Sequence, residues 1–266
     1  MLVKKYLGQN FLVNSYVIDY IISHMCIETN DFIFEIGPGK GALTDSIVSK
    51  TACCYSLTVL EKDKELIPFL KKKFLKPNIE VLCGDILKFD LNSYLSKWLL
   101  SGKVRILGNL PYYISSQILF KLLESRDLIQ DQLLMLQKEV ADRIIATPKK
   151  KEYGKLSVLI QLFYEVEKVI DVTPDKFKPI PKVHSSVIKM SPTDKYVNLV
   201  HDKNCLFEVV RRAFSMKRKM IKNCLVNLVS ERELQSVGIS PTERAQHLPV
   251  SKFICLSNLV STRKFH

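Results

Sequence analysis

The chain contains no Cys-x-x-Cys pair and no run of apolar residues long enough to cross a bilayer. Its seven cysteines are scattered along 266 residues and show no metal-ligand spacing to histidine. An odd number of cysteines without a framework is typical of free thiols in a reducing compartment. These absences exclude a disulfide scaffold, a zinc ribbon and a membrane span, and they predict a cytoplasmic protein without a metal.

Acidic residues are in short supply, with 27 Asp and Glu against 40 Lys and Arg, and the net charge is +13. From residue 191 to the end, 13 Lys and Arg stand against 6 Asp and Glu. Such an excess favours a polyanionic partner. The boundary signal Ser191-Pro192-Thr193-Asp194 divides the chain into a large domain, residues 1–190, and a smaller helical domain, residues 191–266.

A buried-strand pattern at residues 32–36 leads into the turn Gly37-Pro38-Gly39-Lys40-Gly41, and residues 42–48 read as the start of a helix. Strand, glycine turn and helix is the order that lets the backbone approach a nucleotide-like cofactor closely. Strand-like and helical segments continue to alternate as far as residue 190. The pattern predicts an α/β domain with a parallel, Rossmann-like sheet.

Acidic residues follow the next two predicted strands. Glu61 ends the strand at residues 56–60, and Asp85 follows the strand at residues 79–83. A carboxylate in the first position can accept both hydroxyls of a ribose, and one in the second can accept the amine of an adenine. Because carboxyl ends of parallel strands meet at one edge, we expect these acids to face one crevice with the glycine turn.

The segment Asn109-Leu110-Pro111-Tyr112 follows the apolar run at residues 104–108. The amide oxygen of Asn109 and the carbonyl oxygen of Leu110 can accept the two N–H bonds of an exocyclic amine, which leaves its lone pair free. Pro111 biases Leu110 toward an extended conformation, and Tyr112 offers a flat face for a base. An ordinary turn is the alternative. With the acids, the segment favours an S-adenosylmethionine-dependent amino-methyltransferase.

Six motifs in one order carry a resemblance to a known family. They are Gln9-Asn10-Phe11-Leu12, Glu35-Ile36-Gly37-Pro38-Gly39, Asn109-Leu110-Pro111-Tyr112 and the segments at residues 135–143, 153–157 and 177–183. Over nearly the whole chain the sequence resembles the small-subunit ribosomal RNA adenine N6,N6-dimethyltransferases, the KsgA/Dim1 family. The resemblance implies a Rossmann-like S-adenosylmethionine-dependent methyltransferase sheet with a small all-helical C-terminal domain that binds RNA.

The resemblance also implies a role for each matching residue. The implied catalytic residues are Asn109, Leu110, Pro111 and Tyr112, and the target base is expected to stack between Tyr112 and Phe177. Residues expected to hold the cofactor are Gln9, Asn10, Leu12, Glu35, Gly37, Gly39, Glu61, Lys62, Asp85, Ile86 and Asn109. Two positions depart from the family pattern, with Tyr113 in place of Asn and His184 in place of Asp, and we do not expect His184 to act as a base.

Basic residues crowd one segment of the C-terminal domain. An apolar stripe from Leu206 to Leu228 predicts a single helix, on which Glu208 is the only acid. The basic residues expected to bind RNA are Arg211, Arg212, Lys217, Arg218, Lys219 and Lys222. A loop with Lys149, Lys150 and Lys151 is expected to add to this footprint near the active-site rim. The run of lysines at residues 71–73 is interpreted as solvated helix surface.

The implied activity is dimethylation of N6 of two adjacent adenosines in the 3′-terminal hairpin loop of 16S ribosomal RNA. The expected partner is this RNA in immature 30S subunits, late in their assembly, and the enzyme is expected to act as a monomer without metal. Three alternatives stay open: a 23S ribosomal RNA adenine dimethylase of the macrolide-resistance type, a DNA adenine methyltransferase, and a non-catalytic 30S assembly factor.

Overall fold

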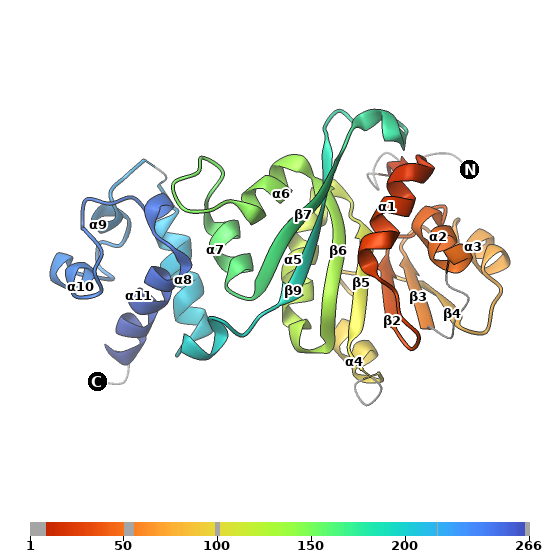
Figure 1. Ribbon diagram of the computed structural model, residues 1–266. Coiled ribbons are helices and arrows are strands. Elements are labelled where there is room, and N and C mark those ends of the chain that lie inside the picture. The colour runs from red at the N-terminus through yellow and green to blue at the C-terminus, as the bar shows by residue number, and fades with distance from the viewer. Residues whose placement is uncertain (1–8, 51–55, 99–101, 217, 264–266) are drawn as a thin grey trace. The chain divides into compact units, whose positions relative to one another are not determined.

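The computed structural model describes residues 9–50, 56–98, 102–216 and 218–263, and it has an α/β architecture around a seven-stranded sheet (Figure 1). The strands of this sheet are β2 (Phe32–Ile36), β3 (Ser56–Glu61), β4 (Ile79–Cys83), β5 (Val104–Asn109), β6 (Ile129–Gln137), β7 (Tyr164–Val172) and β9 (Ser185–Pro192). Their order is β4-β3-β2-β5-β6-β9-β7. Neighbours from β4 to β6 pair in parallel, and β9 is antiparallel to β6. The predicted Rossmann-like sheet is confirmed.

The chain enters this sheet in its middle, at β2. It runs outward through β3 and β4 and returns on the other side of β2 with β5. The direction of winding therefore reverses between β2 and β5. In open α/β sheets, ligands bind in the crevice outside the carboxyl ends of the strands at such a reversal.

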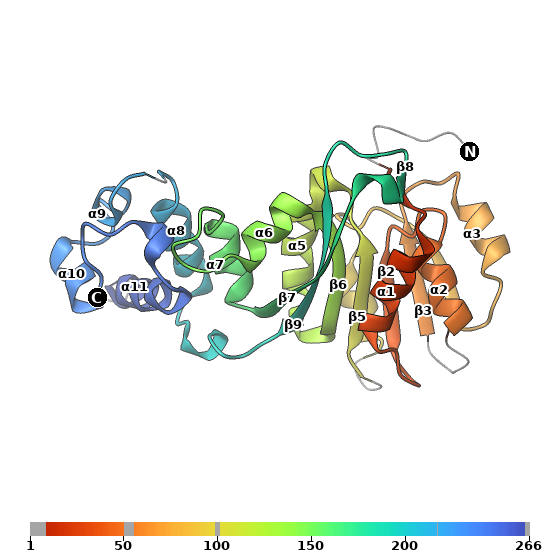
Figure 2. The ribbon, with the colours of Figure 1, turned by 45° about the horizontal axis from the view of Figure 1, so that its top comes forward.

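Helices cover both faces of the sheet. Over all described residues, including those of a second compact unit that contains α7 to α11, the helices are α1 (Ser15–Met25), α2 (Ala42–Lys50), α3 (Ile67–Lys73), α4 (Leu91–Ser96), α5 (Ser115–Glu124), α6 (Lys138–Ile145), α7 (Lys155–Gln161), α8 (Lys203–Ala213), α9 (Ile221–Cys224), α10 (Glu231–Ser236) and α11 (Val250–Arg263). Helices α1 and α2 lie side by side against one face (Figures 1 and 2). Among the described residues, no helix has the combination of length and hydropathy that spanning a membrane requires.

Strand β2 shows why the sequence reads as a mainly apolar run, in which Glu35 is the one charged residue. Ile33 packs in the cluster that holds the buried residues of α1 and α2. Phe34 points to the other face, where its ring contacts those of Phe89 and Tyr94. A parallel strand covered on both faces buries successive side chains, so its sequence is apolar without alternation.

A short second sheet lies near the carboxyl ends of the main one, since its residues Phe11 and Leu12 line a pocket with residues from these strand ends. Strand β1 (Phe11–Leu12) pairs antiparallel with β8 (Phe177–Lys178), and Leu12 lies opposite Phe177. The N–H of Val13 extends the pairing by donating to the carbonyl of Lys176 at 2.9 Å. Segments more than 160 positions apart are joined in this way, and the pair carries the opening motif of the sequence.

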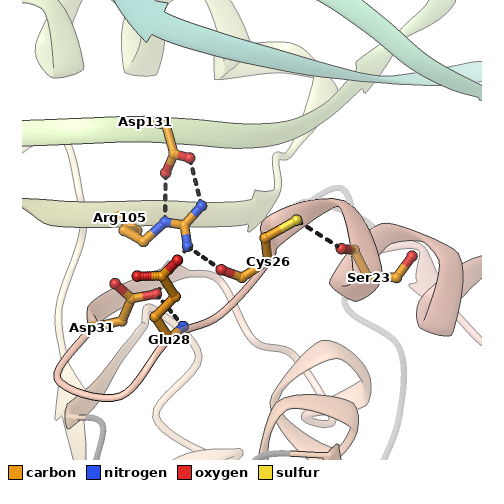
Figure 3. Close-up of polar contacts among 6 residues, drawn as sticks. All are labelled: Ser23, Cys26, Glu28, Asp31, Arg105 and Asp131. Carbon is orange, nitrogen blue, oxygen red and sulfur yellow. Dashed lines mark hydrogen bonds and ion pairs between the residues drawn. The ribbon is translucent and has the colours of Figure 1, made fainter.

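Arg105 on β5 anchors the opposite end of the sheet (Figure 3). Its guanidinium donates to both carboxylate oxygens of Asp131 on β6, at 2.9 and 2.6 Å. It also donates to the carboxylate of Asp31 at 2.8 Å and to the carbonyl of Cys26 at 3.0 Å. The side chain of Arg105 is only 5% exposed, so this fork is a buried cation between two carboxylates. It ties the turn between α1 and β2 to the two neighbouring strands.

The described chain forms two compact units. One comprises residues 1–141 and 167–192, and the other comprises residues 142–166 and 193–266. The second unit begins again at residue 193, close to the predicted boundary, but it also takes in residues 142–166, which the sequence pattern assigned to the catalytic domain. The physical reason is Tyr153, which is buried against the ring of Phe214 and donates from its hydroxyl to the carbonyl of Leu248 at 2.9 Å.

The prediction of one helix from Leu206 to Leu228 is wrong. Helix α8 ends at Ala213, and α9 begins only at Ile221, after Met220 in an extended conformation. The N–H of Ile221 donates to the carbonyl of Glu243 at 2.6 Å, and that of Lys222 donates to Pro241. These long-range bonds satisfy the first N–H groups of α9, so a separate helix can begin there.

Candidate functional site

One pocket at the carboxyl ends of β2 to β5 gathers the predicted site. Its lining includes every residue predicted to hold the cofactor, from Gln9 to Asn109, together with Leu110, Pro111 and Tyr112. These residues come from four successive strand ends and from the opening segment. Phe177 does not line this pocket, whereas Tyr113 does. Among the described residues, no group of three or more His, Cys, Asp or Glu side chains is placed to hold a metal ion.

The glycine turn presents backbone to the pocket. Gly37 has a φ of +66°, and a Cβ built on it would meet nothing within 4 Å. Its N–H donates to the carbonyl of Leu60 at 2.9 Å, which fixes the turn against β3. Gly39 has a φ of +59°, and a Cβ there would lie 2.9 Å from the ring of Phe11. The turn therefore needs glycine for its left-handed backbone, and it leaves open space beside Gly37 for a ligand.

Glu61 is held by backbone donors at the end of β3. One carboxylate oxygen accepts from the N–H of Gly39 at 3.0 Å, and the other accepts from the N–H of Asp63 at 2.8 Å. Two oxygens offer about four lone-pair positions, so acceptor capacity remains beyond these bonds for a ligand hydroxyl. Burial raises the pKa of Glu61, although these N–H bonds work in the opposite direction.

Asp85 follows β4 and forms an ion pair with Lys62, 2.8 Å from Oδ2 to Nζ. Its other oxygen accepts from the N–H of Leu87 at 3.1 Å. Partial burial would raise the pKa of Asp85, but the hydrogen bonds from Lys62 and Leu87 outweigh it and lower the pKa below its ordinary value. Asp85 is therefore an oriented, ionised acceptor at this edge of the pocket.

Glu35 is the most deeply buried acid of the pocket. It is 1% exposed and accepts a 2.6 Å hydrogen bond from the hydroxyl of Thr44 on α2. Burial, opposed by the Thr44 hydrogen bond and reinforced by the negative charge of Glu61, raises the pKa of Glu35 to about 7. The charge of this pocket therefore changes near neutral pH.

We predict that Glu35→Gln changes the pH dependence of stability. Because folding raises the pKa of Glu35 from 4.5 to about 7, the folded chain holds this proton more tightly. The contribution of Glu35 to the free energy of unfolding is fully present below pH 4.5. It falls by on the order of 3 kcal/mol as pH rises through 7. Glu35→Gln should remove this loss. The check is denaturant unfolding of both proteins at pH 5 and pH 8, and a difference that does not vary with pH would contradict it.

The opening motif is tied to both halves of the site. The side-chain amide of Gln9 donates to Asp63 at 2.9 Å, beside Glu61. The carbonyl of Asn10 accepts from Nδ2 of Asn109 at 3.0 Å. Asp63 does not line the pocket but supports two residues that do, and no sequence pattern indicated it, since only its contact with Gln9, 54 positions away, reveals its role. The segment before β1 therefore links the β3 end to the catalytic strand.

This bond between Asn10 and Asn109 orients the Asn109 amide. Since Nδ2 donates to Asn10, Oδ1 is left as the acceptor of the pocket. The N–H of Leu110 donates to the carbonyl of Met135 at 3.1 Å, and Pro111 has φ −59° and ψ 124°. The side chain of Asn109 and the backbone of Leu110 are thus each held by a further contact at the pocket that both residues line.

Tyr112 is held from β9. Its hydroxyl lies 2.6 Å from the hydroxyl of Ser185, which is itself fully buried. Burial raises the pKa of Tyr112, and the Ser185 hydrogen bond offsets part of this rise. The ring is therefore neutral and fixed at its far end. Ser185 is another residue that no local sequence signal identified.

The structure does not bring Phe177 to the pocket. Its side chain is 0% exposed and packs in the cluster that contains Leu12, its partner across the β1–β8 pair. A ring that is wholly covered offers no face to a base, so the expected stacking on Phe177 is not available in this conformation. Burial of an aromatic ring against β1 is the competing effect. His184 is exposed, and its carbonyl accepts from the N–H of Lys138.

The basic residues of the second unit differ in whether an acidic side chain already pairs with them. Arg211 and Arg212 both pair with Glu208, at 2.7 and 2.6 Å, and Lys222 pairs with Glu231 at 3.1 Å. Arg218 and Lys219 are exposed and form no ion pair with any described residue. Lys217 lies outside the described residues. Lys149, Lys150 and Lys151 belong to this same unit, where the N–H of Lys149 donates to the carbonyl of Gln246, rather than to the catalytic unit.

Comparison with known proteins gives concordant matches. A protein family described as "Ribosomal RNA adenine dimethylase" matches residues 2–262. A curated relative from Neisseria gonorrhoeae, named "Ribosomal RNA small subunit methyltransferase A", is 38% identical over 260 residues, covering 98% of this chain and 97% of its own.

Two solved structures are also similar. A dimethyladenosine transferase from Plasmodium falciparum has a TM-score of 0.77 at 26% identity, covering 96% of this chain and 98% of its own. The 23S rRNA methyltransferase ErmE has a TM-score of 0.71 at 23% identity, covering 95% and 100%, a likeness of fold alone.

Proposed function

The chain belongs to the family of ribosomal RNA adenine dimethylases, and from this premise we propose that it dimethylates N6 of two adjacent adenosines in the 3′-terminal hairpin loop of 16S ribosomal RNA. It is an S-adenosylmethionine-dependent ribosomal RNA adenine dimethyltransferase. The observation that carries the proposal is that Asn109, Leu110 and Tyr112 line one pocket with the carboxylates at the strand ends. The relative named for the small subunit supports the choice of RNA.

The pocket fits S-adenosylmethionine by the chemistry of its lining. We propose that Glu61 holds the ribose hydroxyls, that Asp85 accepts from the adenine amine and that the backbone at Gly37 lies along the cofactor. Asn10, Leu12 and Asn109 would enclose the methionine end, with Gln9, Glu35, Gly39, Lys62 and Ile86 completing the lining. The surplus of carboxylates suits a ligand with a positive sulfonium. When bound, the cofactor supplies a methyl group on that sulfonium.

The chain's own residues prepare the nucleophile. An adenine amine shares its lone pair with the ring and is therefore a weak nucleophile. Oδ1 of Asn109 and the carbonyl of Leu110 would each accept one of its N–H bonds, which favours a pyramidal nitrogen with its lone pair directed at the methyl group. Tyr112 would hold the base by stacking. Catalysis then rests on orientation, and the proton leaves readily once the nitrogen has been alkylated.

The target base must leave its stack before it can enter the pocket. Unstacking costs a few kcal/mol, and stacking on an aromatic ring returns roughly 1–3 kcal/mol. We further propose that the substrate is the immature 30S subunit late in assembly, and that the enzyme acts there in the cytoplasm as a monomer. The net charge of +13 supports a polyanionic partner, and the free cysteines support a reducing compartment.

Nucleoside mass spectrometry tests the proposal directly. Unmodified 30S particles and large-subunit RNA are each incubated with the protein and S-adenosylmethionine. Dimethyladenosine in the small-subunit hairpin supports the proposal. Dimethyladenosine in large-subunit RNA would instead identify an enzyme of the macrolide-resistance type, whose fold this chain shares. Tight 30S binding without product would identify an assembly factor.

We predict that Arg218→Glu with Lys219→Glu weakens RNA binding and flattens its salt dependence. Both side chains are exposed and free of ion pairs among the described residues. Removing one Lys or Arg from a phosphate should lower the slope of log Kd against log salt by about one, so the double variant should lower it by about two. The measurement is RNA affinity at several salt concentrations.

A matched control is Lys71→Glu with Lys72→Glu on α3, which changes the net charge by the same amount on a helix interpreted as solvated surface. The control should leave the slope near that of the original protein. Equal slopes for all three proteins would contradict the prediction and would mean that residues 218 and 219 are solvated surface that does not contact RNA phosphates.

A further inference from the structure

Tyr113 presents an exposed aromatic ring at the mouth of the pocket. It follows Tyr112 in the short 3-10 turn Tyr112–Ile114 and lines the same pocket, yet 55% of it is exposed. Its side chain makes no hydrogen bond, ring contact or cation–π contact with any described residue. The ring therefore has no polar or aromatic partner among the described residues that would account for it.

The surroundings of Tyr113 point to the nucleic acid and away from the cofactor. The residues proposed to hold the cofactor's adenosine stand at the ends of β2, β3 and β4, whereas Tyr113 belongs to the segment after β5 that carries Asn109 and Tyr112. Val13, 47% exposed, is another apolar residue that lines this pocket. The mouth thus carries apolar surface beside the amine-binding oxygens.

The covalent structure of RNA indicates which part of the substrate lies against the Tyr113 ring. A base that enters the pocket stays covalently linked to a nucleotide on each side, and these two nucleotides have to remain at the mouth. Bases of single-stranded RNA loops are recognised by stacking on aromatic side chains. We propose that Tyr113 is a positioning residue that stacks on a nucleobase next to the target adenosine. This inference rests on the proposed function and concerns the same site.

The test compares variants of Tyr113 in steady-state methylation of unmodified 30S particles. Tyr113→Ala should raise the KM for particles about tenfold, because a stack present in both ground and transition states affects binding uniformly. Tyr113→Phe and Tyr113→Trp should retain the original KM. Tyr113→Leu, which is apolar but not aromatic, should resemble Tyr113→Ala. The Kd for S-adenosylmethionine and the Tm should be unchanged in all four.

Leu75→Ala serves as the matched control, since Leu75 is 87% exposed and does not line the pocket. A KM for Tyr113→Ala equal to that of this control would overturn the inference, as would full rescue by Tyr113→Leu. Failure of the proposed function has a different signature, because the unsubstituted protein would then form no dimethyladenosine in 30S particles.

Photo-crosslinking locates the contact independently. p-Benzoylphenylalanine at position 113, irradiated on 30S particles, should give a reverse-transcription stop at a nucleotide directly adjacent to a target adenosine. The same group at position 75 should give no stop there. A stop only at distant nucleotides would overturn the inference, even if the KM effect were present.

Discussion

Asn109→Ala is expected to reduce methyl transfer by about 10²–10³-fold, the usual cost of removing one oriented group that stabilises a transition state. The amide has a single arrangement in this structure, because its Nδ2 donates to the carbonyl of Asn10 and its Oδ1 remains as an acceptor. Alanine removes that acceptor and leaves Leu110 to hold the amine alone. The nitrogen lone pair then stays delocalised into the ring for most of its time in the pocket.

RNA binding should be nearly unchanged in this variant, since we propose that other residues make the phosphate contacts and the base stacking. The rate is measured in single turnover at saturating S-adenosylmethionine, because removal of the hydrogen bond to Asn10 is expected to weaken cofactor binding as well. Asn92→Ala, at an exposed position of α4, is the control. A parallel loss of RNA affinity and methylation would refute the division of labour between the pocket and the basic segment.

Arg105→Leu is expected to destabilise the fold by about 3–5 kcal/mol, the usual cost of breaking a buried ion pair from one side. The guanidinium is the shared partner of Asp131 and Asp31, whose side chains are 12% and 11% exposed. Without it, two nearly buried carboxylates face each other with no cation, and the carbonyl of Cys26 loses its donor (Figure 3). The check is the free energy of unfolding in denaturant.

Two comparisons make this result interpretable. Arg105→Leu combined with Asp131→Leu should recover part of the stability, because it removes one of the unpaired charges together with the cation. Glu124→Ala breaks the exposed pair with Lys121, 3.7 Å long, and should change stability by no more than about 1 kcal/mol. A destabilisation below about 1 kcal/mol for Arg105→Leu would mean that water reaches this end of the sheet.

The order of local patterns was enough to predict the sheet and the composition of the pocket. The runs at residues 32–36 and 104–108 are mainly apolar because strands covered on both faces bury nearly all their side chains, and the charged exceptions, Glu35 and Arg105, are hydrogen-bonded. The glycine turn, Glu61, Asp85 and Asn109 follow four successive strands, and the carboxyl ends of parallel strands meet at one edge. Their convergence at one pocket can therefore be predicted without any information on side-chain contacts.

Features that depend on distant contacts could not be predicted in this way. The ring of Phe177 is covered through its pairing with Leu12, and the N–H groups of α9 are satisfied by carbonyls at residues 241 and 243. Residues 142–166 join the second unit through contacts of Tyr153 with Phe214 and Leu248. In each case the deciding partner lies far away in the sequence, where a local pattern carries no signal.

By itself, then, the sequence determined the four strands whose ends carry the pocket, which residues line those ends and what chemistry those residues support, because these follow from local periodicity and from sheet geometry. The tertiary structure alone decided which oxygen of the Asn109 amide faces the pocket, which rings are free to stack and where the second unit begins. Those outcomes depend on which donor or apolar surface the rest of the fold brings to each group.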